Sequence, residues 1–130
     1  MKVMLDTNVL ISALVFGGKT KLLLENLILS DYEIFVSQYV CAEFNEKLKL
    51  KWPDKADRLI SIFHKMNFNF CPSTDEVLCE VRDKKDVPVL SDAIFNKVDI
   101  LLTGDKDFLE SNITNPMIYS PAMMCEFLGL

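Results

Sequence analysis

Four acidic residues, far apart in the chain, have the chemistry that a metal-dependent reaction needs: Asp6, Glu43, Asp86 and Asp105. Carboxylates that meet in one pocket repel each other, raise each other's pKa and destabilise the fold unless a cation neutralises them. In a chain with a single histidine, oxygen ligands favour Mg²⁺ or Mn²⁺ over zinc or copper. The four acids therefore predict a site for a hard divalent ion.

Each of these acids, taken alone, also fits a structural role. Asp6 and Asp105 follow apolar segments and could cap the helices that come next, because a carboxylate accepts hydrogen bonds from the first free amide groups. Glu43 could form an ion pair with Lys47 one turn later. Asp86 could cap a helix from a solvated loop. Further acids lie near these positions: Asp83, Asp92, Asp99 and Asp107.

The sequence argues against other enzyme classes. No two of the cysteines, Cys41, Cys71, Cys79 and Cys125, form a C-x-x-C pair, so we expect reduced thiols and no structural zinc. The single histidine, His64, has no serine or cysteine in a G-x-S-x-G motif to activate. Serine-type hydrolysis is therefore excluded.

The charge balance also limits the kinds of ligand that the chain can attract. The chain has 14 Lys plus Arg against 19 Asp plus Glu, a net charge of -5. No overall positive field attracts nucleic acid or an anionic membrane, so a phosphate ligand must be bound by positive charge close to the site. The first apolar segment contains Asp6 and Asn8, where a signal peptide would be continuously apolar. We expect a cytoplasmic protein that does not contact a membrane.

The elements that must position the acids alternate between strands and helices. Apolar runs predict buried strands at Lys2 to Leu5, Glu33 to Val36, Phe68 to Cys71 and Ile100 to Thr103. Apolar spacings of three and four, with capping residues, predict helices after Thr7, Thr20, Ser37, Pro53, Pro88 and Ser120, and the capping box Ser73 to Glu76 predicts another short helix. This alternation predicts the α/β class, a three-layer α/β/α fold with a central parallel sheet, in a single domain of residues 1–130.

Such a sheet would gather the acids, because ligand sites of parallel sheets form at the carboxyl ends of the strands. Asp6 and Asp105 directly follow predicted strands, and Glu43 lies at the edge of the apolar stripe of a predicted helix, where it should be half-buried. A response-regulator receiver domain also has acids at strand ends. It needs an aspartate after a middle strand, where this chain has Ser37.

Over essentially its whole length the chain resembles a PIN domain. The matching segments are Val3 to Val9, Ser37 to Tyr39 leading to Glu43, Asp86 to Leu90 leading to Ala93, and Leu101 to Leu109. Four such segments in the right order and spacing are fairly specific. The chain looks most like the bacterial and archaeal toxin components of toxin–antitoxin pairs. Asp92 departs from the pattern, because the resemblance predicts a small apolar residue at that helix position.

The resemblance implies roles for individual residues. Asp6, Glu43, Asp86 and Asp105 match the family's acidic quartet, which holds one or two Mg²⁺ or Mn²⁺ ions, and Asp107 would add a ligand through water. Asn8 and Thr103 resemble the polar residues that support the quartet. Lys47, with Lys19 and Lys106 nearby, is the candidate for contact with the phosphate backbone.

The implied activity is that of a metal-dependent endoribonuclease that hydrolyses RNA phosphodiester bonds. As a toxin it would have an antitoxin protein as partner, and we expect a homodimer or higher homo-oligomer, with Phe16, Trp52 and Phe127 as candidates for exposed contact residues. Two alternatives stay open: an RNA-processing or decay nuclease that is not a toxin, and a catalytically silent PIN fold that serves as a binding module. Retention of all four acids favours activity.

Overall fold

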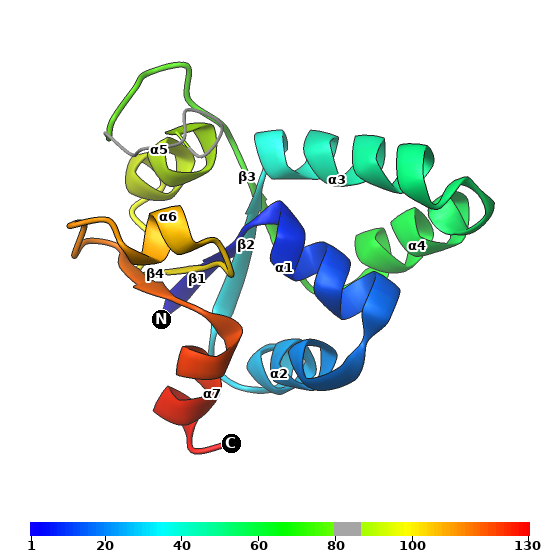
Figure 1. Ribbon diagram of the computed structural model, residues 1–130, viewed down its shortest axis with the longest axis horizontal. Coiled ribbons are helices and arrows are strands. Elements are labelled where there is room, and N and C mark those ends of the chain that lie inside the picture. Colours follow the sequence, from blue (N-terminus) through cyan, green and yellow to red (C-terminus); the bar gives the residue numbers. More distant parts are fainter. Residues whose placement is uncertain (80–86) are drawn as a thin grey trace.

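The computed structural model describes residues 1–79 and 87–130, and over this part of the chain five parallel strands form one sheet (Figure 1). The strands are β1 (Lys2–Leu5), β2 (Glu33–Ser37), β3 (Asn69–Cys71), β4 (Ile100–Leu102) and β5 (Met117–Tyr119). Their order across the sheet is β3-β2-β1-β4-β5. The predicted α/β class with a central parallel sheet is confirmed.

Strand β1 lies in the middle of the sheet and pairs on both sides. Met4 is opposite Phe35 of β2 and opposite Leu101 of β4. The apolar residues of β1 and β4 are fully buried, as expected for strands covered on both faces. The pairing brings the carboxyl ends of β1 and β4 together at one edge of the sheet.

Helices cover both faces of the sheet. They are α1 (Thr7–Ile11), α2 (Gly18–Leu29), α3 (Gln38–Lys51), α4 (Pro53–Lys65), α5 (Val87–Phe95), α6 (Lys106–Leu109) and α7 (Pro121–Leu128), and the π-helix η1 (Ser12–Phe16) extends α1. Figure 1 shows α3 and α4 as a hairpin on one side of the strands and α5 on the other, with α2 and α7 next to each other. The predicted three layers are present.

Local capping chemistry explains where several helices begin. The Ser37 hydroxyl accepts a hydrogen bond from the Val40 N–H at the start of α3, and the Ser120 hydroxyl accepts one from the Met123 N–H at the start of α7. Pro53 occupies the first turn of α4, where its missing N–H is not needed. These three predicted helix starts are confirmed.

The region after β1 differs from the prediction. The π-helix closes with a hydrogen bond of 2.9 Å from the Gly17 N–H to the Ser12 carbonyl oxygen, and α2 begins at Gly18 rather than being capped by Thr20. The Thr20 hydroxyl instead accepts a hydrogen bond from the Ser12 hydroxyl at 3.3 Å. Within the described residues no single helix is long and apolar enough to cross a membrane, and the one pair that qualifies together is bent by 108° at the break between η1 and α2.

The short helix predicted after Ser73 is wrong, because residues 73–79 contain no helix. The Ser73 hydroxyl is engaged elsewhere: it donates to the carboxylate of Asp92 in α5 and accepts from the Tyr39 N–H at the start of α3. These two contacts orient the hydroxyl toward α3 and α5, and not toward the N–H groups of its own segment.

An aromatic cluster holds the α3–α4 hairpin to the sheet. Phe63 is fully buried, and its ring centroid lies 4.8 Å from that of Phe44 and 5.5 Å from that of Phe68. Buried aromatic side chains contribute the largest apolar areas to a core. The cluster therefore fixes α3, the helix that carries Glu43.

We expect Phe63→Ala to lower the free energy of unfolding by about 3–5 kcal/mol, because the truncation leaves a cavity among buried rings. Urea denaturation followed by circular dichroism measures this loss. The control is Phe127→Ala, since Phe127 is 50% exposed on α7. Equal losses from the two variants would contradict the assignment of the cluster as the core of the hairpin.

Candidate active site

Asp6 lies at the carboxyl end of β1 and is only 5% exposed. Its Oδ1 accepts a hydrogen bond of 2.8 Å from the Val9 N–H, so it caps α1. Its Oδ2 accepts a hydrogen bond from the hydroxyl of Thr103, which follows β4. The register of β1 and β4 explains this contact, because Leu5 pairs with Leu102 and the next residue of each strand is then adjacent.

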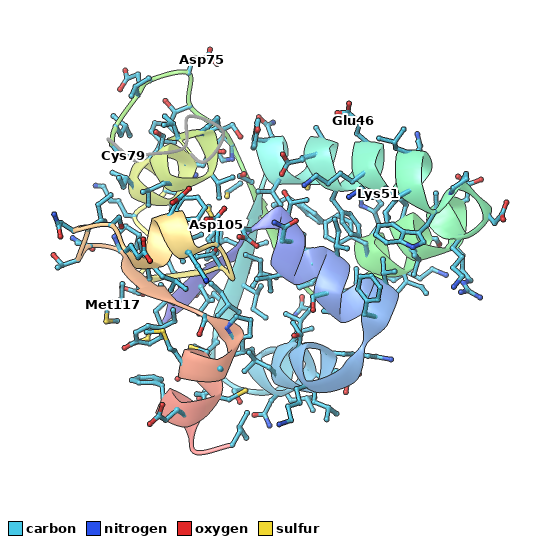
Figure 2. All side chains as sticks on the ribbon, in the orientation of Figure 1. Glu46, Lys51, Asp75, Cys79, Asp105 and Met117 are labelled. Atoms are coloured by element: carbon cyan, nitrogen blue, oxygen red, sulfur yellow. The ribbon has the colours of Figure 1, made fainter. Side chains whose placement is uncertain are left out.

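Thr103 also links Asp6 to Asp105. The Thr103 side-chain oxygen, which donates to Asp6, accepts a hydrogen bond of 3.1 Å from the Asp105 N–H. Asp105 caps α6 through an acceptor contact of 2.8 Å with the Asp107 N–H, and it is half-buried. Figure 2 shows Asp105 between α6 and the first turn of α1.

Glu43 reaches the same region from α3. It is half-buried, as its place at the edge of the apolar stripe predicted, and its carboxylate accepts a hydrogen bond from the hydroxyl of Thr7, the residue after Asp6. One turn later on α3, the Lys47 ammonium donates to the Asn8 side-chain oxygen at 3.5 Å. Two contacts thus join α3 to the start of α1.

The electrostatics of Asp6 reflect this crowding. The pKa of Asp6 is raised to about 6 as the net result of several causes: burial raises it most, the hydrogen bonds from Thr103 and Val9 lower it, and the negative charges of Asp105 and Glu43 raise it. Asp105 and Glu43 therefore lie close enough for their charges to act on Asp6. Two of the structural alternatives are also present, because Asp6 caps α1 through Oδ1 and Asp105 caps α6 through Oδ1.

The donor set fits a hard divalent ion in its chemistry. It consists of oxygen ligands, and the surplus negative charge around the buried Asp6 is what such an ion would compensate. Among residues 1–79 and 87–130, no three acidic, histidine or cysteine side chains are already arranged as a complete metal cluster. The fourth acid of the predicted quartet, Asp86, lies outside the described residues.

A second buried acid, Asp92, has a different environment. It is fully buried and accepts hydrogen bonds from the Ser73 hydroxyl at 2.7 Å and the Thr74 N–H at 2.9 Å. Its charge, after burial, contributes to raising the pKa of Cys71 to about 11. Asp92 therefore anchors the segment after β3 to α5. The sequence pattern alone did not predict this role. Its only signal in the sequence was the pair Ser73 and Thr74.

Comparisons with known proteins agree with this fold. The sequence profile of the family described as PIN domain matches residues 2–107. Among the solved structures, the chain is similar to one in the crystal structure of VapBC2 from Rickettsia felis bound to a DNA fragment from their promoter. The TM-score is 0.73 at 20% sequence identity, covering 92% of this chain and 98% of that chain. None of the curated proteins matches.

We expect Asp6→Asn to raise the stability of the metal-free protein above pH 6, by about 2 kcal/mol once the lost hydrogen bond from Thr103 is allowed for. Above pH 6 the native carboxylate is charged in both states, and the folded state bears the cost of burying it. As the pH falls from 6 toward the ordinary value of 3.8, the folded state takes up its proton first, so the advantage of asparagine shrinks. Thermal melts in EDTA across this pH range measure the trend.

Asp6→Ala is the matched control for the cap. It removes the charge as well, but it also removes the acceptor for the Val9 N–H, which is worth about 1 kcal/mol. It should therefore gain less than Asp6→Asn. A pH-independent difference between Asp6→Asn and the wild type would refute the buried-charge explanation.

Proposed function

The chain belongs to the PIN domain family, and on that premise we propose that it is a Mg²⁺- or Mn²⁺-dependent endoribonuclease that hydrolyses RNA phosphodiester bonds. The observation that carries the proposal is the buried carboxylate of Asp6, which shares a hydroxyl with Asp105 and feels the charges of Asp105 and Glu43. A fold without a use for this arrangement would gain stability by replacing the buried carboxylate.

In this proposal Asp6, Glu43, Asp86 and Asp105 hold one or two divalent ions, and Asp107 contributes through water. A bound ion of this kind lowers the pKa of a water molecule and offsets charge on the phosphate and on the leaving oxygen. Glu43 is a ligand or orients the attacking water. Neutralising the pocket also removes the mutual repulsion of the carboxylates.

The neighbouring polar residues position these groups. The Thr103 hydroxyl fixes the orientation of the Asp6 carboxylate, and the Thr7 hydroxyl does the same for Glu43. Partners of this kind hold ligand side chains in the geometry that binding needs. Asn8 holds the ammonium of Lys47 beside the site, where it can contact a backbone phosphate.

The net charge of -5 is consistent with weak binding of RNA in the absence of metal. No broad positive surface is needed if the cation and a few local lysines neutralise the substrate. Substrate affinity should then depend on the divalent ion as well as on ionic strength.

We further propose that the protein is the cytoplasmic toxin of a toxin–antitoxin pair, with an antitoxin protein as partner and a homo-oligomeric state. The similarity to a chain of the VapBC2 complex supports this role, although at 20% identity that likeness establishes the fold alone. A nuclease of RNA processing or decay would share the same site chemistry, and a silent binding module would share only the fold. The following two experiments separate these roles.

The purified chain should cleave fluorescently labelled single-stranded RNA in Mn²⁺ or Mg²⁺ and lose this activity in EDTA. Asp105→Asn and Glu43→Gln should each lower the cleavage rate by at least about a hundredfold, because each removes a charge from the proposed reaction centre. Gel analysis of the products measures the rates. The matched control is Glu46→Gln, since Glu46 is exposed on the same helix and points away from α1 (Figure 2). Retained cleavage in Asp105→Asn would overturn the assignment, and no cleavage by the wild type in either metal would favour the silent module.

Induced expression in a bacterial host should arrest growth if the chain is a toxin, because unchecked cleavage of RNA stops protein synthesis. Asp105→Asn, expressed to the same level, should allow growth. Colony counts after induction and a blot for the protein measure both quantities. Normal growth with a wild-type protein that is active in vitro would favour RNA processing over the toxin role.

A further inference from the structure

Phe16 is an exposed aromatic residue at the end of the helical segment that starts beside Asp6. It is 72% exposed. Its ring makes an edge-to-face contact with Trp52, with ring centroids 5.7 Å apart and an interplanar angle of 82°. Trp52 is partly buried against the core and follows directly after α3. The pair therefore joins the far ends of η1 and α3.

The backbone holds this pair in place. The wide turn of η1 ends at Gly17, whose φ of +75° is readily adopted only without a side chain, and its N–H bonds to the Ser12 carbonyl oxygen. The Trp52 N–H donates to the Leu48 carbonyl oxygen at 2.8 Å. Both aromatic residues thus lie at well-defined helix ends, and Phe16 keeps most of its ring surface open to solvent.

The same two segments also lie beside two of the proposed carboxylates, because Asp6 caps α1 and Glu43 belongs to α3. Thr7 contacts Glu43 at their near ends, Asn8 contacts Lys47 next, and Phe16 meets Trp52 at the far ends. Asn8 lies in the first turn of α1 and Phe16 at the last position of η1, so the contacts with α3 and its end run from one end of this helical segment to the other. The surface therefore presents acids, then an ammonium group, then an exposed aromatic ring.

Two lysines of α3 lie along this strip, the surface that runs from Glu43 past Asn8 to Phe16. Lys47 and Lys51 are four residues apart on α3 and share one side of the helix, whereas Lys49 points about 160° away from it. Figure 2 labels Lys51 on the side of α3 that is turned toward α1 in this view. In a chain with a net charge of -5, Lys47 and Lys51 thus supply positive charge along one side of α3, and Lys47 contacts Asn8 of α1.

We propose that Phe16, supported by Trp52, is a stacking platform for a base of single-stranded RNA, and that Lys47 and Lys51 contact the phosphates between this base and the carboxylates. The inference rests on the proposed nuclease function and names where its substrate lies. Aromatic rings stack on any base, while lysines track the backbone, so the strip favours single strands without strict sequence choice. The alternation of cation and ring along a line that leads from the acids is why RNA, rather than a second protein surface, is the occupant.

Binding of a short fluorescein-labelled oligouridylate tests the platform in the full chain. The background is Asp105→Asn, so that the RNA stays intact, and fluorescence anisotropy with Mn²⁺ gives the dissociation constant. Phe16→Ala should weaken binding about tenfold, since stacking on one ring contributes that order of affinity. Phe16→Tyr should bind like the parent, and Phe16→Leu, which keeps apolar bulk without a ring, should bind like Phe16→Ala. Phe127→Ala is the control for an exposed aromatic residue elsewhere.

Trp52 is the one tryptophan of the chain, so its emission is a second readout. Oligouridylate should quench this emission in the parent and less in Phe16→Ala. Lys51→Gln should weaken binding and reduce its salt dependence, whereas Lys49→Gln on the opposite side should leave both unchanged. An oligomer of the same length with abasic sugars should bind equally to parent and Phe16→Ala, because it has no base to stack.

The outcomes separate the platform from the nuclease function. Unchanged RNA affinity in Phe16→Ala overturns the platform even if the wild type cleaves RNA. If Phe16→Ala weakens RNA binding but the wild type does not cleave RNA, the stacking platform is supported and the proposed nuclease function is wrong. If Phe16→Ala instead changes the oligomeric state in light scattering while RNA affinity stays the same, the surface is a contact between copies of the chain and the proposal is wrong.

Discussion

The arrangement of the site follows from one constraint, the burial of the Asp6 carboxylate at the end of the central strand. Transfer of a charged group out of water is unfavourable unless hydrogen bonds or a counter-charge compensate it. The Val9 N–H and the Thr103 hydroxyl supply two hydrogen bonds, and each comes from an element that must then lie close by. The Thr103 side-chain oxygen in turn accepts a hydrogen bond from the Asp105 N–H. The hydroxyl that orients the Asp6 carboxylate therefore also fixes the backbone that carries the Asp105 carboxylate.

The two buried acids of the described chain show how environment assigns a role. Asp92 accepts hydrogen bonds from a hydroxyl and from a backbone N–H of the segment after β3, and so it holds that segment against α5. Asp6 also receives two hydrogen bonds, but other carboxylates act on it, and its pKa is raised to about 6. Burial is the largest cause of this rise, and the charges of Asp105 and Glu43 add to it, so a cation beside Asp6 would offset both effects.

Helices α1 and α3 connect the carboxylates to a surface well outside the pocket. Both begin at the same sheet edge, and the contacts continue from Thr7 and Glu43 to the exposed Phe16 and the partly buried Trp52. The aromatic cluster of Phe44, Phe63 and Phe68 holds α3 against α4. A polymeric substrate could in this way be held at several points along one strip, with chemistry confined to its end.

The sequence by itself determined the α/β class, the strands that precede Asp6 and Asp105, and the helix starts at Ser37, Pro53 and Ser120. These features depend on periodicity and on capping groups within a few residues of each other. Only the tertiary structure decided that Ser73 binds Asp92 instead of starting a helix, and that Glu43 pairs with Thr7. Such contacts join residues far apart in the chain, and packing selects among several acceptors that a hydroxyl could reach.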